Sequence, residues 1–292
     1  MRRTTPPRER PARALRLIVE GRRGLHEDHH VAVQILNEAK LEASKRVELL
    51  GQLSEVVIRK QPRLLDQLAA DIFELHVDAL PAARKAIAGL IEEICITKSS
   101  FLPQATLALI TLQSDSVPAG VKKTVGVCTA LFKESLLLIS RSADSPQMRA
   151  LWKDMLIIKG RICGIASEYS NDGVRVYALK FVESLVLLYT PAARPAEPLK
   201  DNKAFDVANL PPNHPVLNAK AMGREAEAFL MTLLDKLPSP SNQGDHKLKS
   251  IVLIVMINSV SSVALNREQL FSVVVPRLLD LCRYLVDAKS KR

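Results

Sequence analysis

Apolar residues recur with the period of an α-helix along most of the chain, and the segment 171–190 is the clearest case. Its apolar residues fall on one stripe of a 3.6-residue repeat. These residues are Val174, Ala178, Phe181, Leu185 and Tyr189. The turn-prone trio 171–173 precedes the stripe, and its carboxylate can cap the first free backbone N–H groups. The segment therefore predicts a helix with one packing face.

The same period returns in segment after segment from His30 onward, with connections of mostly two to five residues. Short connections force neighbouring helices to be antiparallel. No alternating run rich in Val, Ile or Thr is followed by a hairpin turn. The sequence therefore predicts an all-α protein. The expected helices are 30–40, 44–60, 62–77, 81–97, 99–113, 118–141, 146–169, 172–190, 218–237, 245–265 and 267–287.

Four of these helices begin in the same way, with a proline or aspartate three or four residues before a cation. The starting residues are Pro81, Pro118, Pro146 and Asp172. The cations Arg84 and Lys122 are 38 residues apart, close to the roughly 40-residue period of HEAT and armadillo repeats. Arg149 and Arg175 do not keep this period. We therefore predict a degenerate HEAT/armadillo-like α-solenoid of about five helix pairs.

A long proline-rich segment, 191–217, interrupts the helical pattern. It contains six prolines, so it cannot form one helix. A loop of this length inside a compact unit is uncommon and often functional. A strap that lies over the array and has no binding role accounts for it equally well.

The N-terminal residues 1–29 are rich in arginine and proline, and helical periodicity begins only near Leu15. We interpret them as a disordered basic leader. Abundant arginine would also suit an organelle transit peptide, but four acidic residues argue against it. The predicted organisation is this leader, a HEAT-like domain over 30–287 and a basic tail, 288–292.

Charge and composition narrow the possible functions. The net charge is +10, but much of it lies in the two ends, so it is a weak argument for nucleic-acid binding. Aromatic residues make up only 4% of the chain, which leaves few flat surfaces for stacking bases. No apolar run is long enough to span a bilayer. The four cysteines are widely spaced, which favours a reducing compartment.

No motif of catalysis or cofactor binding is present. The sequence lacks a phosphate-binding Gly-rich loop, a dinucleotide-binding turn and a nucleophile elbow. His26, His29 and His30 adjoin two acidic residues, but without a second ligand cluster we read them as incidental. We predict no enzyme activity, no metal site and no cofactor.

Two stretches then resemble a known family. The first stretch is 171–175 with the following 178–183, and the second is 211–215, at the end of the proline-rich loop. Weaker matches lie at 62–66, 84–85, 89–93 and 152–155. In order and spacing, these stretches resemble the N-terminal domain of symplekin, over roughly residues 35–285. Symplekin is the scaffold of the pre-mRNA cleavage and polyadenylation machinery.

The resemblance implies a nuclear, non-catalytic scaffold with other cleavage and polyadenylation factors as partners. It also implies an arc of HEAT-type helices whose concave side holds a phosphatase acting on serines of the RNA polymerase II tail. Lys180 matches the family's lysine that faces this phosphatase. The family normally continues into a long C-terminal half, so we expect a short member, a fragment or an incomplete gene model.

The expected partner-binding residues lie on the helix 172–190 and on the helix after the loop. They are Val176, Tyr177, Lys180, Glu183 and Ser184, extended by Lys220 and Arg224 at i, i+4 spacing. A solvated ridge would carry the same residues. Direct RNA binding by a basic solenoid and a cargo-adaptor role remain alternative functions.

Overall fold

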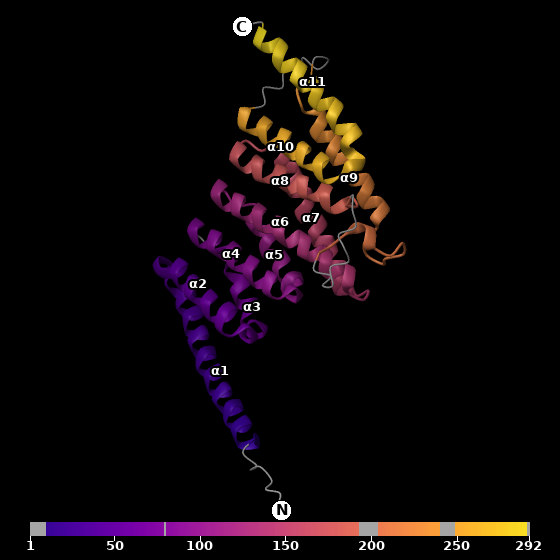
Figure 1. Ribbon diagram of the computed structural model, residues 1–292. Coiled ribbons are helices and arrows are strands. Elements are labelled where there is room, and N and C mark those ends of the chain that lie inside the picture. Colours follow the sequence, from indigo (N-terminus) through magenta and orange to yellow (C-terminus); the bar gives the residue numbers. More distant parts are fainter. Residues whose placement is uncertain (1–9, 79, 193–203, 240–248, 291–292) are drawn as a thin grey trace, which may run out of the picture. The chain divides into compact units, whose positions relative to one another are not determined.

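The computed structural model describes residues 10–78, 80–192, 204–239 and 249–290, with side chains from residue 26 onward except at 288 and 289 (Figure 1). Within these ranges the regular structure is helical, which confirms the predicted all-α class. The α-helices are α1 (Arg10–Leu41), α2 (Arg46–Ser54), α3 (Leu65–Glu74), α4 (Pro81–Thr97), α5 (Leu102–Leu112), α6 (Pro118–Arg141), α7 (Pro146–Glu168), α8 (Asp172–Tyr189), α9 (Ala219–Asp235), α10 (Ser250–Asn266) and α11 (Phe271–Ser290).

Most helix boundaries agree with the predicted ones to within a few residues, and short 3-10 or π turns fill several of the remaining positions. The first helix differs most, because α1 starts at Arg10 instead of near residue 30. Residues 10–29 contain many strong helix formers, which can extend a neighbouring helix without an apolar stripe of their own. Residues 1–9 of the predicted leader lie outside the described part.

The chain divides into two compact units, residues 1–97 and 98–292. The sequence predicted one repeat domain over 30–287, and joint action of the two units as one domain stays a prediction. In the first unit, α2 packs against both α1 and α4. In the second, α8 packs against α6, α7, α9 and α10 and is the central helix.

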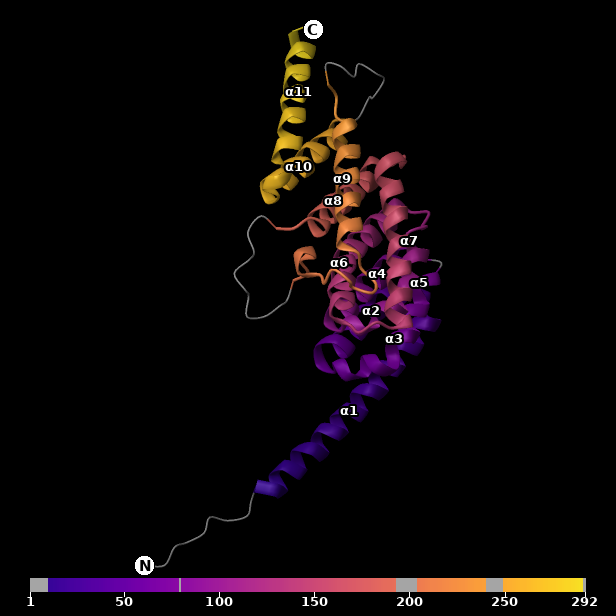
Figure 2. The same cartoon turned by 90° about the vertical axis from the view of Figure 1, so that its right-hand side faces the viewer.

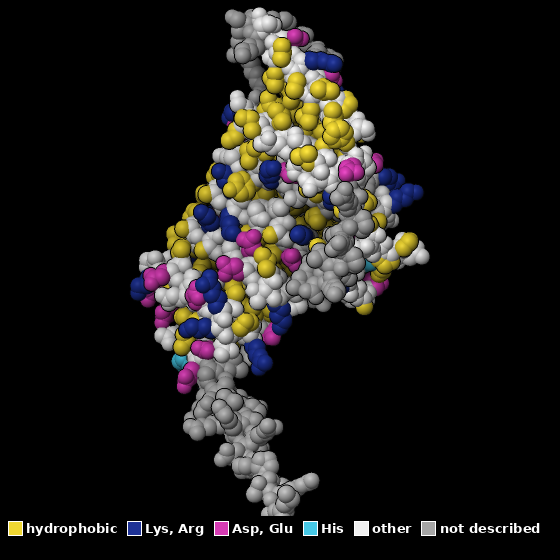
Figure 3. All heavy atoms as spheres, in the orientation of Figure 1, with side chains coloured by type: hydrophobic (Ala, Val, Ile, Leu, Met, Phe, Trp, Pro, Cys, Tyr) yellow, Lys and Arg dark blue, Asp and Glu magenta, His cyan; other side chains and the backbone are white. Residues whose placement is uncertain are grey.

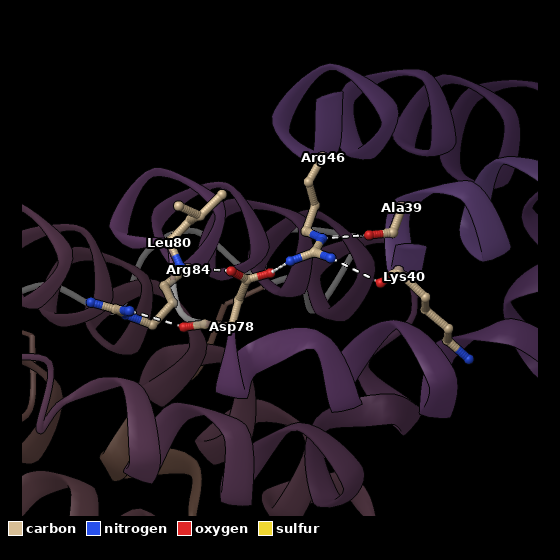
Figure 4. Close-up of polar contacts among 6 residues, drawn as sticks. All are labelled: Ala39, Lys40, Arg46, Asp78, Leu80 and Arg84. Carbon is tan, nitrogen blue, oxygen red and sulfur yellow. Dashed lines mark hydrogen bonds and ion pairs between the residues drawn. The ribbon is translucent and has the colours of Figure 1, made fainter. Parts of the chain in front are cut away.

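A buried polar network holds the first unit together (Figure 4). The Arg46 guanidinium donates to the carbonyls of Ala39 and Lys40 at the end of α1 and pairs with the buried Asp78 carboxylate. Asp78 also accepts from the backbone N–H of Leu80 (2.6 Å), just before α4. One arginine thus satisfies carbonyls that α1 leaves unpaired and joins them to the start of α4.

In the second unit, α6, α8 and α10 lie side by side and run parallel. At their starts, Lys122 Nζ approaches Gly173 so closely that a Cβ there would lie 2.7 Å away, and Lys249 pairs with Asp172 (2.6 Å). At the far end, Arg267 after α10 donates to a backbone carbonyl just beyond α8 (3.1 Å). Figures 1 and 2 show α5, α7 and α9 as the second layer behind this row.

The core of the second unit is largely aliphatic, with one aromatic cluster between α6, α7 and α8. Phe132 meets Phe181 edge to face at 5.5 Å between ring centroids. Trp152 and Tyr189 lie against the same Phe132 ring at 6.0 and 6.3 Å. Trp152 therefore contributes to packing.

The described part of the proline-rich loop, 204–217, packs onto the second unit. Phe205, Val207, Leu210 and Leu217 are buried, and a 3-10 turn, Val207–Asn209, is capped by Asp206. This half of the loop is therefore anchored by apolar contacts. Residues 193–203 lie outside the described part, so a functional loop and a strap without a binding role both stay predictions for the whole segment.

Candidate partner-binding surface

The helix expected to carry the site begins with a side-chain cap. The Asn171 carboxamide oxygen accepts from the backbone N–H of Val174 (3.2 Å), which satisfies one donor that a helix start leaves free. The Asp172 carboxylate, which the sequence suggested as the cap, instead pairs with Lys249 at 2.6 Å and with Arg175 at 3.8 Å. A turn-prone polar trio therefore starts α8, with Asn171 in the capping role.

The predicted apolar stripe of α8 faces the core. Each of its five members is at most 1% exposed. They are Val174, Ala178, Phe181, Leu185 and Tyr189. Neighbours on four sides bury most of the remaining surface, which leaves one narrow exposed stripe on α8. That stripe lies between α6 and α10.

Four of the five residues predicted on this helix lie along the exposed stripe. Tyr177 and Lys180 are exposed, and Val176 and Ser184 are half-buried. The fifth, Glu183, points into the protein, and its side chain is only 12% exposed. The sequence placed all five on one open face, and Glu183 departs from that placement.

Each exposed side chain is held by a neighbour. Lys180 Nζ lies 2.7 Å from Glu183 Oε2, and the Ser184 hydroxyl donates to the Lys180 carbonyl (3.0 Å). On the α6 side, Lys122 lies over the Tyr177 ring at 5.9 Å. Such contacts reduce the rotamer freedom that a partner would have to remove on binding.

Lys220 and Arg224 are exposed on α9, but the structure does not bring them to Lys180. Met222 and Ala226, each two residues further along α9, are buried in the core. At 100° per residue, the two cations therefore lie on the side of α9 that faces away from its packing contacts. Among the described residues no contact joins them to α8, so their part in one continuous site stays a prediction.

The neighbouring helices of the row expose residues at the same helical positions as α8. Val176 is the fifth residue of α8. Lys122 is the fifth residue of α6, and Ile254 is the fifth residue of α10. Lys180 is in the ninth position, and Asn258 is its equivalent on α10. Parallel, adjacent helices with matched exposed positions make one surface, which we name the row surface.

Residues of α10 give this surface its apolar part, and the site predicted from the sequence did not include them. Ile254 is 56% exposed and Leu265 is 80% exposed. Figure 3 shows hydrophobic side chains gathered over α10 and α11. The signal was available in the sequence, because the positions follow from counting along each helix once its start is known.

A second buried polar contact lies behind the row surface, between α7, α8 and α9. Lys159 Nζ is 2.6 Å from the Glu225 carboxylate and lies 5.6 Å from the centroid of the Tyr189 ring. The neighbouring Cys163 is half-buried, and desolvation raises the pKa of its thiol to about 12. This cluster joins three helices, and its thiol is protonated at neutral pH, so it is a poor nucleophile.

The other cysteines and the possible metal ligands of the described residues likewise form no reactive cluster. None of the four cysteines forms a disulfide, and burial raises the pKa of the Cys95 thiol to about 12. Over the described ranges no three His, Cys, Asp or Glu side chains come together as a metal site. No described helix combines the length and apolarity that a membrane span requires.

Comparison with known families gives a match over the second unit. The model of the Symplekin/PTA1 N-terminal family matches residues 118–290, from the start of α6 to the end of α11. The match covers more than half of the chain and includes the complete row surface. It also confirms the resemblance that the residues at 171–183 and 211–215 had indicated. The chain belongs to the Symplekin/PTA1 N-terminal family.

Proposed function

We propose that this chain is a non-catalytic scaffold of the pre-mRNA cleavage and polyadenylation machinery, and that its row surface docks a phosphatase acting on serines of the RNA polymerase II tail. Membership in the Symplekin/PTA1 N-terminal family suggests the scaffold role in mRNA 3′-end processing. The observation that carries the docking site is the position of Lys180, half-exposed at the centre of three parallel helices.

The composition of the row surface suits a protein partner. Tyr177, Ile254 and Leu265 are exposed apolar or aromatic groups, and Lys180 supplies a charge between them. Interfaces are typically built from such apolar anchors around a few oriented polar groups. A carboxylate on the phosphatase could replace or share Glu183 as the partner of Lys180, which would give the complex its orientation.

The proposal places the protein in the nucleus with other cleavage and polyadenylation factors as partners. A scaffold needs no catalytic group of its own. This agrees with the protonated state of the buried Cys95 thiol and the half-buried Cys163 thiol at neutral pH. Repeat arrays typically work in this way, because their extended surfaces hold other proteins.

Affinity purification tests the proposal. The full 292-residue chain is immobilised, nuclear extract is passed over it, and the retained proteins are identified by mass spectrometry. We expect 3′-end processing factors and the tail phosphatase, with the phosphatase lost when Lys180→Ala replaces the wild-type chain. The matched control is Lys153→Ala, an exposed lysine on α7, in the other layer. Retention of cargo-transport proteins alone would contradict the proposal.

A further inference from the structure

Four cations converge on the start of α8 in the second unit. Lys122 lies near the start of α6, Arg175 in the first turn of α8, Lys236 directly after α9 and Lys249 directly before α10. Figure 1 shows α6, α8 and α10 beginning on the same side, and dark blue side chains recur along that margin in Figure 3. Residues far apart in the sequence thus form one cationic cluster.

Two of the cations flank the first residues of α8 from opposite neighbours. Lys122 Nζ lies so close to Gly173 that an added Cβ would be 2.7 Å from it. On the α10 side, Lys249 Nζ is 2.6 Å from the Asp172 carboxylate, although most of the lysine side chain is exposed. A lysine on α6 and a lysine directly before α10 therefore approach the same dipeptide, Asp172–Gly173.

The other two cations lie deeper. The Arg175 side chain is mostly buried, lies 3.8 Å from Asp172 and donates weakly to the Ser167 carbonyl at 3.4 Å. Its Nε is buried and has no hydrogen-bond acceptor. Burial, followed by the nearby Arg175 charge, lowers the pKa of Lys236, while Glu168 raises it. Positive charge is therefore incompletely balanced here.

Among the described residues, the carboxylates that face these four cations are Asp172 and Glu168. Two negative charges against four positive ones leave room for a dianion. We propose that this cluster, Lys122, Arg175, Lys236 and Lys249, binds the phosphate of a phosphorylated serine or threonine in a partner protein. Arg175 supplies the buried unused donor, and the exposed Lys249 can turn from Asp172 to the phosphate.

The shape of the cluster favours one phosphate group over a nucleic-acid strand. Three of the cations, Lys122, Arg175 and Lys249, approach a single dipeptide instead of following a line. Tyr177 is an exposed aromatic ring beside them. Strand binding generally uses a longer cationic groove with several stacking rings. The backbone does not form the site, because Asn171 already accepts the N–H groups of Val174 and Arg175. Recognition therefore depends on side chains.

Fluorescence anisotropy tests the site directly. The probe is a fluorescein-labelled Gly/Ser heptapeptide with one central phosphoserine, titrated with the full chain at constant ionic strength. The unphosphorylated peptide is the first control. We expect saturable binding of the phosphopeptide alone. Equal binding of both peptides, or binding of neither, would overturn the proposal.

Variants with opposite expected effects on phosphopeptide affinity make the test more specific. The double change Lys122→Ala/Lys249→Ala should weaken phosphopeptide binding at least tenfold. Asp172→Asn removes the competing carboxylate and should strengthen binding severalfold, which a general loss of folding cannot do. Lys133→Ala, on the same helix as Lys122, should leave the affinity unchanged. An affinity insensitive to the double change would contradict the site.

Two further measurements distinguish phosphopeptide binding from RNA binding and from phosphatase docking. A twelve-nucleotide single-stranded RNA that bound more tightly than the phosphopeptide and depended on the same lysines would overturn the proposal in favour of RNA. Lys180→Ala should leave phosphopeptide affinity unchanged, while weakening phosphatase docking. The phosphate site and the proposed docking surface can therefore fail separately.

Discussion

Lys180 Nζ lies 2.7 Å from Glu183 Oε2, one turn further along α8. The lysine side chain is 49% exposed, whereas the glutamate side chain is only 12% exposed. Lys180 therefore neutralises a carboxylate that α8 carries into the protein, and it presents its remaining surface to solvent. A residue that looks like a simple surface cation in the sequence has a role in the fold as well.

This pairing changes the expected effect of Lys180→Ala on stability. As an isolated surface change it would alter stability by no more than about 0.5 kcal/mol. Leaving Glu183 without its cation should instead cost about 1 kcal/mol, a value reduced for the half-exposed lysine. Urea denaturation followed by circular dichroism measures the difference. Adding Glu183→Gln should restore most of the loss, and an unchanged urea midpoint for Lys180→Ala would contradict this account.

The Arg46–Asp78 pair predicts a larger effect in the first unit. Their side chains are 13% and 3% exposed, so Arg46→Ala leaves a buried carboxylate and two helix-end carbonyls without their donor. The expected loss is about 3 kcal/mol. Lys45→Ala, at the preceding and mostly exposed position, should leave the denaturation midpoint close to that of the wild type. Equal denaturation midpoints for the two variants would show that the network in Figure 4 does not stabilise the unit.

Thiol reactivity should separate the cysteines by burial. Burial raises the pKa of Cys95 and Cys163 to about 12. Both thiols are therefore protonated at pH 7.5, and their thiolates form only near or above pH 12. Cys282 is exposed. We expect a thiol reagent at pH 7.5 to label Cys282 within minutes and the other two only after unfolding. Mass spectrometry of the labelled peptides reports this, and rapid labelling of native Cys163 would contradict its assigned environment.

The apolar part of the row surface can be tested without disturbing the core. Leu265 on α10 is 80% exposed, and Leu107 on α5, in the other layer, is 68% exposed. Leu265→Asp should weaken phosphatase docking at least tenfold, because a charge would be buried in the interface. Leu107→Asp is the matched control and should bind normally. Calorimetric titration would refute an α10 contribution if both variants retained wild-type affinity.

Helical periodicity predicted the fold and the inward face of α8, because both depend on local spacing. It did not predict the burial of Glu183, which depends on how closely neighbouring helices cover that side of α8. It also could not place Lys122 beside Gly173 or Lys249 beside Asp172, because these pairs are joined by packing and not by sequence separation. Lys220 and Arg224 show the converse, since a shared i, i+4 spacing on α9 did not bring them to Lys180.

Calorimetric titration of the purified RNA polymerase II tail phosphatase tests the central claim most directly. The titrated proteins are wild type, Lys180→Ala/Glu183→Gln and the control Lys153→Ala, an exposed position on α7. The double variant removes the lysine without leaving an unpaired buried carboxylate, so a change in affinity reports docking and not unfolding. We predict that the double variant binds at least tenfold more weakly, about 1.4 kcal/mol, while the control binds as wild type does. Equal affinities for all three proteins would contradict docking at Lys180.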